Sequence, residues 1–374
     1  MQFSIQKAAF LEALTKVQGI AGRKTSFPIT QNLLLSAEEE SLALSATDLE
    51  VGFSGRYPAV VAQAGKTTVP ARKLYEIVKE FPSDAVDVSE MENGWVKIGD
   101  DRLQFTIVSM DPADFPKLPE IEETSFATIE AAALKDLVDK VNLAGGVAAE
   151  EKRPHLIGVF LTAVPVDAGI VLRMVSTDGN RLAMSECAVK EVEPGFLPEK
   201  GAIVPKKVMA EVAKLLEDDR PVRLGVKGNY FVLVLNGETL ISRLVEGDYP
   251  DYTMVIPKGI ETQFTTDRAA FTNTLKRMSI LSSERYRAVR FSIAPDLLTV
   301  RIVNPDIGES KESLPVSFNG PAIETSFNAR YFLDAAAVMR SEKIRVRIKD
   351  AERACIVEGD EDPGYISVIM PMRA

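Results

Sequence analysis

Apolar and polar positions follow one pattern three times along the chain. Each copy opens with a short strand-like segment, a polar step, and an alanine-rich stretch whose apolar residues recur at helical spacing. These openings occupy residues 3–14, 126–137 and 264–275. The pattern predicts three repeated units, each starting with a strand and a helix.

A second predicted helix recurs later in each unit. It is introduced by the dipeptides Val69-Pro70, Val204-Pro205 and, more loosely, Phe327-Asn328. Proline suits the first helical position because its missing N–H would have no partner there. The first of these helices has an apolar face at residues 74, 77, 78 and 81, and the second has one at residues 208, 212, 215 and 216. Such faces are typical of helices that pack on a sheet.

Strand patterns fill the rest of each unit in hairpin runs. After the second helices they occupy residues 86–88, 95–98, 103–108, 222–226, 230–235, 239–244, 344–348, 354–357 and 365–370. One large α/β domain fits poorly, because its strands would alternate singly with helices. We therefore predict an α+β fold of three repeated domains, each with two helices and antiparallel sheet, at residues 1–123, 124–257 and 258–374.

Composition places the chain among ordinary globular proteins. Its 374 residues suffice for two or three cores, and hydrophobic residues make up 46%. No apolar run approaches the roughly 18 residues of a membrane span, and the N-terminus does not resemble a signal peptide. Cys187 and Cys355 lie far apart without metal-ligand spacing, which favours free thiols in a reducing cytoplasm.

The net charge of −10 argues against nucleic-acid binding, but its distribution changes the picture. Six windows covering the predicted helices together carry +6, which leaves −16 on the remainder. Ordinary solvated helix faces would explain a bias of this size. If instead the units close into a ring with helices inside, a positive lining would attract DNA phosphates without reading bases. The candidate DNA-facing cations are Arg23, Lys24, Arg72, Lys79, Lys207, Lys214, Arg268 and Arg277.

Motifs for catalysis, cofactors and metals are missing from the sequence. The segment Gly65-Lys66-Thr67 has Val60 where a phosphate-binding loop requires glycine. His155 is the single histidine, so a multi-histidine metal site is excluded. Acidic groups such as Glu358 and Asp360 are typical of solvated loops. We therefore expect no catalytic residue, no cofactor and no metal.

A tight turn in the middle of the chain carries the most informative residues. Asp178-Gly179 separates two β-rich runs, which is a strong hairpin signal because glycine accepts a positive φ. Arg181 and Leu182 follow at once, so a guanidinium and an apolar side chain stand beside the turn. At its far end the chain stops in an apolar segment, residues 368–373, which on its own suggests only an edge strand.

These two segments closely resemble the signature segments of the bacterial sliding clamp family, the β subunit of DNA polymerase III. The resemblance extends to residues 30–35, 46–50, 68–73 and 248–252. It implies a head-to-tail homodimer of three-domain clamp subunits, forming a cytoplasmic ring around duplex DNA and acting as a processivity factor without catalytic activity. The implied partners are the DNA polymerase III α subunit, the clamp loader, translesion polymerases and mismatch-repair proteins, and no membrane.

The resemblance also implies a pocket that captures peptides from partner proteins. Asn180 replaces the histidine often found after the glycine, and Met254 stands where an arginine is common. The implied pocket residues are Leu156, Thr177, Gly179, Asn180, Arg181, Leu182, Pro250, Met254, Val255, Asn328, Tyr331, Val368, Met370, Pro371, Met372 and Arg373. The implied dimer interface has Lys73, Leu74 and Phe105 facing Ile280 and Leu281, near Glu309 and Glu312.

Two other functions fit the sequence. One is a scaffold of three α+β units that does not bind DNA, and the other is a hydrolase built from scattered carboxylates. Retention on circular but not linear DNA distinguishes a clamp from a scaffold. Turnover abolished by one carboxylate substitution would favour the hydrolase.

Overall fold

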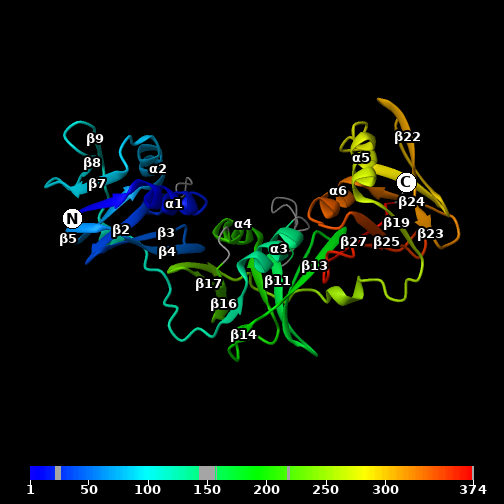
Figure 1. Ribbon diagram of the computed structural model, residues 1–374, viewed down its shortest axis with the longest axis horizontal. Coiled ribbons are helices and arrows are strands. Elements are labelled where there is room, and N and C mark those ends of the chain that lie inside the picture. Colours follow the sequence, from blue (N-terminus) through cyan, green and yellow to red (C-terminus); the bar gives the residue numbers. More distant parts are fainter. Residues whose placement is uncertain (22–26, 143–155, 157, 217–219, 373–374) are drawn as a thin grey trace. The chain divides into compact units, whose positions relative to one another are not determined.

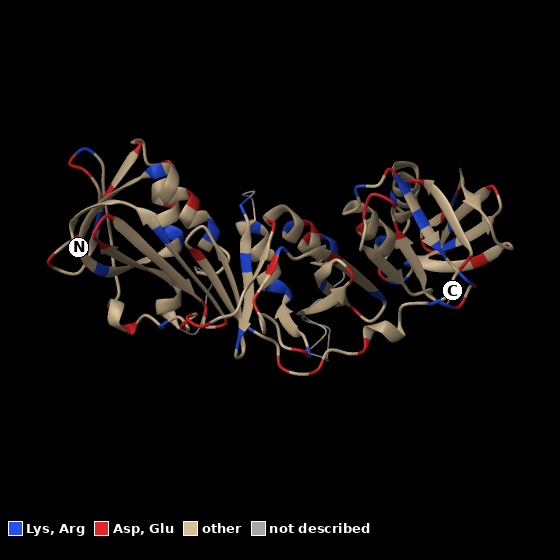
Figure 2. Cartoon of the chain, turned by 60° about the horizontal axis from the view of Figure 1, so that its bottom comes forward, with Lys and Arg blue, Asp and Glu red and all other residues tan. Residues whose placement is uncertain are grey.

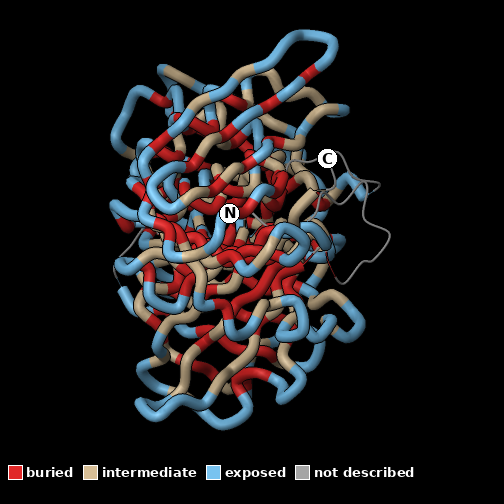
Figure 3. The backbone as a smooth tube through the Cα atoms, turned by 90° about the vertical axis from the view of Figure 1, so that its right-hand side faces the viewer, coloured by how far each residue is buried: buried red, intermediate tan, exposed pale blue. Residues whose placement is uncertain are grey.

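The computed structural model describes residues 1–21, 27–142, 156, 158–216 and 220–372. The chain forms two compact units, each described here by itself. The first consists of Met1–Ala132, Lys190–Phe196 and Ala210–Leu244, and the second of Ala133–Val189, Leu197–Met209 and Val245–Ala374. Buried backbone runs through the interior and exposed loops lie outside it (Figure 3).

Each repeat opens with the strand and helix that the sequence predicts (Figure 1). These pairs are β1 (Gln2–Gln6) with α1 (Lys7–Val17), β10 (Ala127–Ile129) with α3 (Ala131–Asn142), and β19 (Gln263–Asp267) with α5 (Arg268–Ser279). The later helices are α2 (Ala71–Glu80), α4 (Lys206–Leu215) and α6 (Ala329–Ala337). The repeat prediction is confirmed.

The predicted position of the prolines is wrong by one residue. Pro70 ends strand β6 (Gly65–Pro70) and is the N-cap of α2, with an extended ψ of 114°. Pro205 likewise ends β15 (Ala202–Pro205), and α4 starts at the next residue. The prolines therefore close the preceding strand instead of opening the helix.

The first compact unit contains two antiparallel sheets. A five-stranded sheet has the order β5-β1-β7-β8-β9, and a nine-stranded sheet has the order β14-β10-β16-β17-β18-β4-β3-β2-β6. The strands not yet given are β2 (Asn32–Glu38), β3 (Ser41–Thr47), β4 (Val51–Pro58), β5 (Val60–Gln63), β7 (Ala85–Glu90), β8 (Val96–Gly99), β9 (Gln104–Ile107), β14 (Glu191–Val192), β16 (Val222–Lys227), β17 (Tyr230–Leu235) and β18 (Glu238–Arg243).

The second compact unit also contains two antiparallel sheets. Their orders are β15-β11-β12-β13-β27-β26-β25-β19-β23 and β22-β21-β20-β24. The strands not yet given are β11 (Gly158–Val166), β12 (Gly169–Thr177), β13 (Arg181–Ala188), β20 (Ala288–Ala294), β21 (Leu297–Asn304), β22 (Gly308–Pro315), β23 (Ser317–Phe318), β24 (Ile323–Asn328), β25 (Lys343–Arg347), β26 (Cys355–Glu358) and β27 (Ile366–Ile369).

The nine-stranded sheets join half-sheets from neighbouring repeats. Each repeat contributes a half-sheet of five strands and a half-sheet of four. In the first seam β18 pairs with β4, and in the second seam β27 pairs with β13. Strands of the middle repeat consequently belong to both compact units, so these units do not follow the predicted domains. All the described ladders are antiparallel, as an α+β fold requires.

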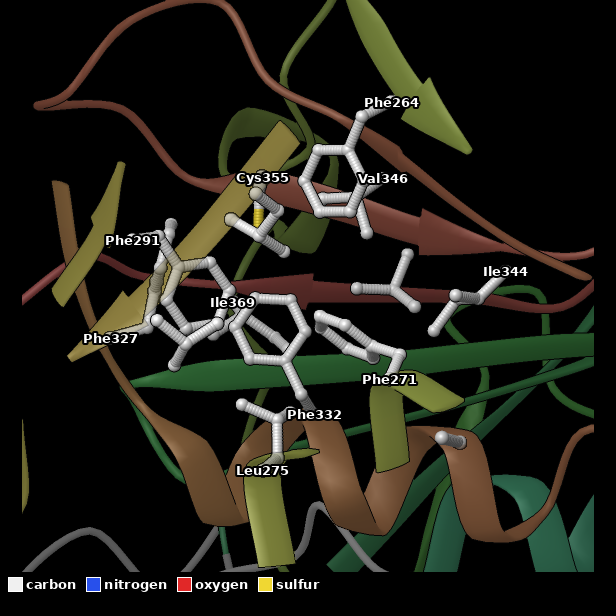
Figure 4. Packing of buried hydrophobic residues seen from close by; sticks show 14 of the residues in the cluster. Phe264, Phe271, Leu275, Phe291, Phe327, Phe332, Ile344, Val346, Cys355 and Ile369 are labelled. Atoms are coloured by element: carbon white, nitrogen blue, oxygen red, sulfur yellow. The ribbon is translucent and has the colours of Figure 1, made fainter. Parts of the chain in front are cut away.

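An aromatic cluster forms the core of the third repeat (Figure 4). Phe332 on α6 lies 5.7 Å from Phe271 on α5 and 5.2 Å from Phe327 on β24, measured between ring centroids. Edge-on rings at these distances attract one another beyond the burial of their surface. Cys355 is a free thiol in the same cluster, and burial raises its pKa. The helices are thereby fixed against one face of the sheets.

One position of the first helix carries a cation in every repeat. It is Lys16 in α1, Lys140 in α3 and Arg277 in α5, each nine residues after the helix starts. The Lys140 side chain is only 3% exposed, and its ammonium lies 3.0 Å from Asp362 and 2.8 Å from Asp136. Asp362 also accepts hydrogen bonds from the N–H groups of Arg340 and Ser341. The charge of the buried lysine is therefore balanced by two carboxylates.

We predict that Asp362→Asn destabilises the fold in a pH-dependent way. Burial opposes ionisation of Asp362, but the N–H groups of Ser341 and Arg340, the Ser341 hydroxyl and Lys140 outweigh it, so its pKa lies below its usual value. A lowered folded pKa contributes stability above the unfolded value, and this contribution disappears as pH falls through the folded pKa. Urea unfolding should show a loss of about 1.5–3 kcal/mol at pH 7 that shrinks below about pH 4.

The control is Asp101→Asn, since that carboxylate is fully exposed beside Lys97. It should leave the free energy of unfolding close to that of the wild type at both pH values. An equal loss for Asp362→Asn at both pH values would contradict the role of the ionised carboxylate.

Candidate binding pocket

The Asp178-Gly179 turn is the predicted hairpin, between β12 and β13. Asp178 accepts hydrogen bonds from the N–H groups of Asn180 and Arg181, both at 3.0 Å. The hydroxyl of Thr177 accepts one from the N–H of Gly179 at 3.1 Å. Gly179 has a φ of 86°, which disfavours any residue with a β-carbon. Hydrogen bonds between near neighbours in the sequence and one glycine therefore set the direction in which Arg181 leaves the turn.

Arg181 is held on three sides inside the second unit. Its guanidinium contacts Asp178 at 3.0 Å and Asp334 at 2.7 Å, and lies 4.5 Å from the ring centroid of Tyr331. Burial works to lower the pKa of Arg181, but the hydrogen bonds and charges of Asp334 and Asp178 raise it. The Arg181 side chain is thus mostly buried, and its charged guanidinium is held in one position.

A hollow of about 240 Å³ opens beside this turn. Nine of the predicted residues line it, namely Leu156, Thr177, Gly179, Arg181, Leu182, Pro250, Val255, Val368 and Met370. Leu182 and Val368 are direct cross-strand partners in the second seam, so the pairing of two repeats builds the floor. The hollow is mostly apolar with a few polar groups, which is typical of a ligand site.

Tyr249, Asp251 and Tyr252 also line the hollow, and the predicted set lacks them. Tyr249 stacks on Phe160 with ring centroids 4.8 Å apart, and the Tyr252 hydroxyl accepts a hydrogen bond from Arg173 at 3.1 Å. The signal was present in the sequence, since residues 248–252 carry the family resemblance. The rings of Tyr249 and Tyr252 pack on Phe160 of the sheet. They hold the segment between β18 and β19, which we call the linker, in place as one wall of the hollow.

The other predicted pocket residues that the structure describes do not line this hollow. Asn328 caps α6 by accepting from the N–H of Arg330, and the Asn180 carbonyl accepts from the N–H of Met370 at 2.9 Å. Met254 is 82% exposed. Tyr331 contacts Arg181, whereas Pro371 and Met372 line a neighbouring hollow of about 810 Å³, which we name the tail hollow. Arg373 is outside the described residues.

The first seam has a different hollow at the corresponding place. Gly52 opposes Ile241 there, as Leu182 opposes Val368 in the second seam. A β-carbon on Gly52 would lie 2.6 Å from the side chain of Leu118, so Leu118 occupies the space that a larger residue would need. That hollow, of about 460 Å³, is lined by Gly52, Leu118 and Ile241 among others, so the two seams present hollows of different lining.

The helices carry acidic as well as basic residues (Figure 2), and many of the helix cations have partners. Arg72 pairs with Glu76, Lys214 pairs with Glu211, and Arg277 binds Glu312 through two nitrogens. Arg268 donates to the Ser341 and Ala336 carbonyls, which joins α5 to the end of α6. Lys79 is exposed and Lys207 half-buried, while Arg23 and Lys24 lie outside the described residues. The positive excess is thus smaller locally than the cation count suggests.

The predicted interface residues differ in exposure. Ile280 is 76% exposed, Lys73 is exposed beside Glu76, and Phe105 is half-buried on β9. Leu281 is half-buried against the third repeat's core. Leu74 is fully buried within the single chain, because it faces the sheet from α2. It can therefore affect an interface only by holding α2 in position, and not by direct contact.

Within the described ranges, no group of three or more His, Cys, Asp or Glu side chains is arranged to hold a metal ion. No described helix has both the length and the apolar character needed to cross a membrane.

Three family models match consecutive parts of the chain. They are the N-terminal, central and C-terminal domains of the DNA polymerase III beta subunit, at residues 1–119, 128–251 and 253–373. The chain belongs to the β sliding clamp family. Its function is accordingly that of a sliding clamp, and its fold is the three-domain clamp fold.

Relatives and solved structures agree over full length. The beta sliding clamps of Pseudomonas putida and Escherichia coli are 34% and 30% identical, each covering 100% of both chains. A crystal structure of the Caulobacter crescentus clamp matches with a TM-score of 0.91 at 31% identity. The Bartonella birtlesii clamp, solved bound to griselimycin, matches with a TM-score of 0.93 at 31% identity. Both structures cover 100% of each chain.

We predict that Gly179→Ala destabilises the clamp by about 1 kcal/mol, because alanine is strained at positive φ. Urea unfolding measures the loss. Asn180→Ala in the same turn is the matched control, since Asn180 contributes backbone groups to the bonds described above and its φ is not positive. Equal stability of Gly179→Ala and the wild type would show that the turn relaxes without cost.

Proposed function

We propose that two copies of the chain close head to tail into a ring around duplex DNA and tether DNA polymerase III. The observation that carries this proposal is the half-sheet pattern. Two seams join the repeats within the chain, which leaves β9 of the five-stranded sheet and β22 of the four-stranded sheet at sheet edges. Edge strands present unpaired N–H and C=O groups that favour pairing with another chain. A head-to-tail contact of this kind either closes a ring or polymerises.

The proposed contact between β9 of one copy and β22 of another would be a third seam, and the ladders give its expected register. Ser54, Met184 and Lys311 hold the same ladder position in the half-sheets that contain β4, β13 and β22. In the two internal seams, Thr239 opposes Ser54 and Ile366 opposes Met184.

Gln104 is the residue of β9 that corresponds to Thr239 and Ile366. Gln104 is therefore expected opposite Lys311 of a second copy, and Phe105 opposite its Ser310. Glu309 and Glu312 flank this contact, and Ile280 lies exposed at the end of α5. These residues agree with the interface that the family resemblance implies.

Duplex DNA is the proposed occupant of the ring, contacted through the helix faces of the repeats. The candidate contacts are the cations named from the sequence, with Arg268 and Arg277 restrained by their partners in the chain. We assign no catalytic activity to the clamp, place it in the cytoplasm, and retain domain limits at residues 123/124 and 257/258.

The apolar hollow is the proposed docking pocket for short peptides from partner proteins. It combines an aromatic linker wall, a seam floor and the thioether of Met370, whose flexibility suits several ligands. The proposed partners are the polymerase α subunit, the clamp loader, translesion polymerases and mismatch-repair proteins. We include the surrounding residues Asn180, Met254, Asn328, Tyr331, Pro371, Met372 and Arg373 as a rim.

Phe105→Glu should convert the dimer into monomers, because it places a carboxylate beside Glu309 and Glu312 of the second copy. Sedimentation measures the mass, and retention on circular but not linear plasmid measures encirclement. The matched control is Val60→Glu on β5, the opposite edge of the same sheet, where Val60 is 75% exposed. A dimeric, plasmid-retained Phe105→Glu variant would refute the proposed interface.

Deleting residues 370–374 should abolish peptide binding and leave the fold intact. The cut follows β27 and removes two described backbone bonds, from Met370 to Asn180 and from Met372 to Ser326. Fluorescence anisotropy with a clamp-binding peptide measures affinity, and circular dichroism reports folding. Met91→Ala is the control, because Met91 is a partly exposed methionine in the first unit. Wild-type affinity in the folded truncation would place the pocket elsewhere.

A further inference from the structure

A further hollow, of about 470 Å³, lies on the sheet of the third repeat, and we name it the arginine hollow. Four arginines line it without any carboxylate: Arg285, Arg287, Arg290 and Arg301. Tyr286, Ala288, Val303, Ser326 and Met372 complete its lining.

The arginine hollow is continuous with the docking pocket. It shares Arg290, Ser326 and Met372 with the tail hollow, and the tail hollow shares Met370 with the pocket. The N–H of Met372 donates to the Ser326 carbonyl at 2.8 Å, so the C-terminal segment lies along β24 between the two ends. A groove thus runs from an apolar pocket, past Met370 and Met372, to a cationic end.

The arginines at the cationic end lie close enough to repel one another, which lowers the stability of the sheet. Arg290 and Arg301 are direct cross-strand partners on β20 and β21, and like charges in that position destabilise a sheet. Each has a carboxylate of its own, Glu324 at 3.1 Å and Glu309 at 2.5 Å. Arg285 and Arg287 are exposed and form no ion pair among the described residues. Two charges therefore remain available to a ligand.

The arginine hollow lies on the sheet face away from the helices. On β20 and β21, Arg290 and Arg301 alternate with Phe291 and Val300, which are buried in the aromatic core beside α5 and α6. Alternate residues of a strand point to opposite faces. The face proposed for DNA is the helical one, so the hollow is on the side that carries the docking pocket.

We propose that the arginine hollow binds an acidic segment flanking the apolar anchor of a docking peptide. Arg285 and Arg287 pair with its carboxylates, while Tyr286 and Met372 cover its backbone. This inference rests on the proposed pocket and adds the chemistry of the ligand beyond the anchor. The tail hollow also contains Glu324 and Glu352, so the acidic residues are expected at the far end and not directly beside the anchor.

The experiment compares labelled peptides that share one apolar core. One carries four glutamates after a short neutral spacer at its N-terminal side, a second carries them at its C-terminal side, and matched peptides carry glutamines. Because the groove leaves the pocket in one direction, one glutamate peptide alone should bind more tightly than its glutamine match. Two exposed ion pairs, with Arg285 and Arg287, correspond to roughly five-fold at low salt, declining as salt rises.

Arg285→Gln with Arg287→Gln should remove this gain and leave core-peptide affinity unchanged. Arg56→Gln with Arg243→Gln is the matched control, since both arginines are exposed in the first unit and the same charge is lost. Sedimentation and circular dichroism confirm assembly and folding of each full-length variant.

Equal affinity of glutamate and glutamine peptides, or an equal effect in the control variant, would overturn the inference while leaving the pocket established. Failure of the core peptide itself to bind would instead overturn the proposed pocket. A duplex oligonucleotide that loses affinity in Arg285→Gln with Arg287→Gln, with no peptide effect, would identify nucleic acid as the ligand and refute the acidic-peptide assignment.

Discussion

Antiparallel pairing between strands of neighbouring repeats is the interaction on which this clamp depends. Each repeat has two half-sheets that cannot both close on themselves, because β4, β13, β18 and β27 would otherwise end in unpaired backbone groups. Joining half-sheets satisfies those groups and fixes the order of the repeats. The same joints bring Leu182 beside Val368, so the floor of the proposed docking pocket exists only because two repeats share one sheet.

The helices depend on the seams in turn. Lys140 leaves α3 and reaches Asp362, a residue of the third repeat, while Lys16 leaves α1 and reaches Glu238 of the second at 2.7 Å. A cation at one repeated position therefore links the first helix of repeats one and two to the following repeat. Arg277 holds the same position in the last repeat and turns to Glu312 within its own repeat. Charge on these helices thus serves assembly of the chain as well as any contact with DNA.

Local patterns predicted most of the fold, because apolar spacing decides helix and strand within a few residues. The turn at Gly179 followed from its dipeptide, and the apolar faces of α2 and α4 from their spacing. The seams were not predictable, since they pair strands such as β4 and β18 that are far apart in sequence. For the same reason the partners of Arg268 and Arg277, and the full burial of Leu74, could not be read from the chain. Pocket residues came from family resemblance, which found the turn and the tail but lacked the linker tyrosines.

The difference between the hollows at the two seams bears on how many partner proteins one ring could bind at a time. The hollow at the first seam has Leu118 over Gly52 where the hollow at the second seam has the side chains of Leu182 and Val368, so the two differ in shape and lining. If the proposed pocket at the second seam is the docking site, a ring of two chains carries two such sites. Partner proteins that bind there would then compete, and the order of exchange would follow their residence times.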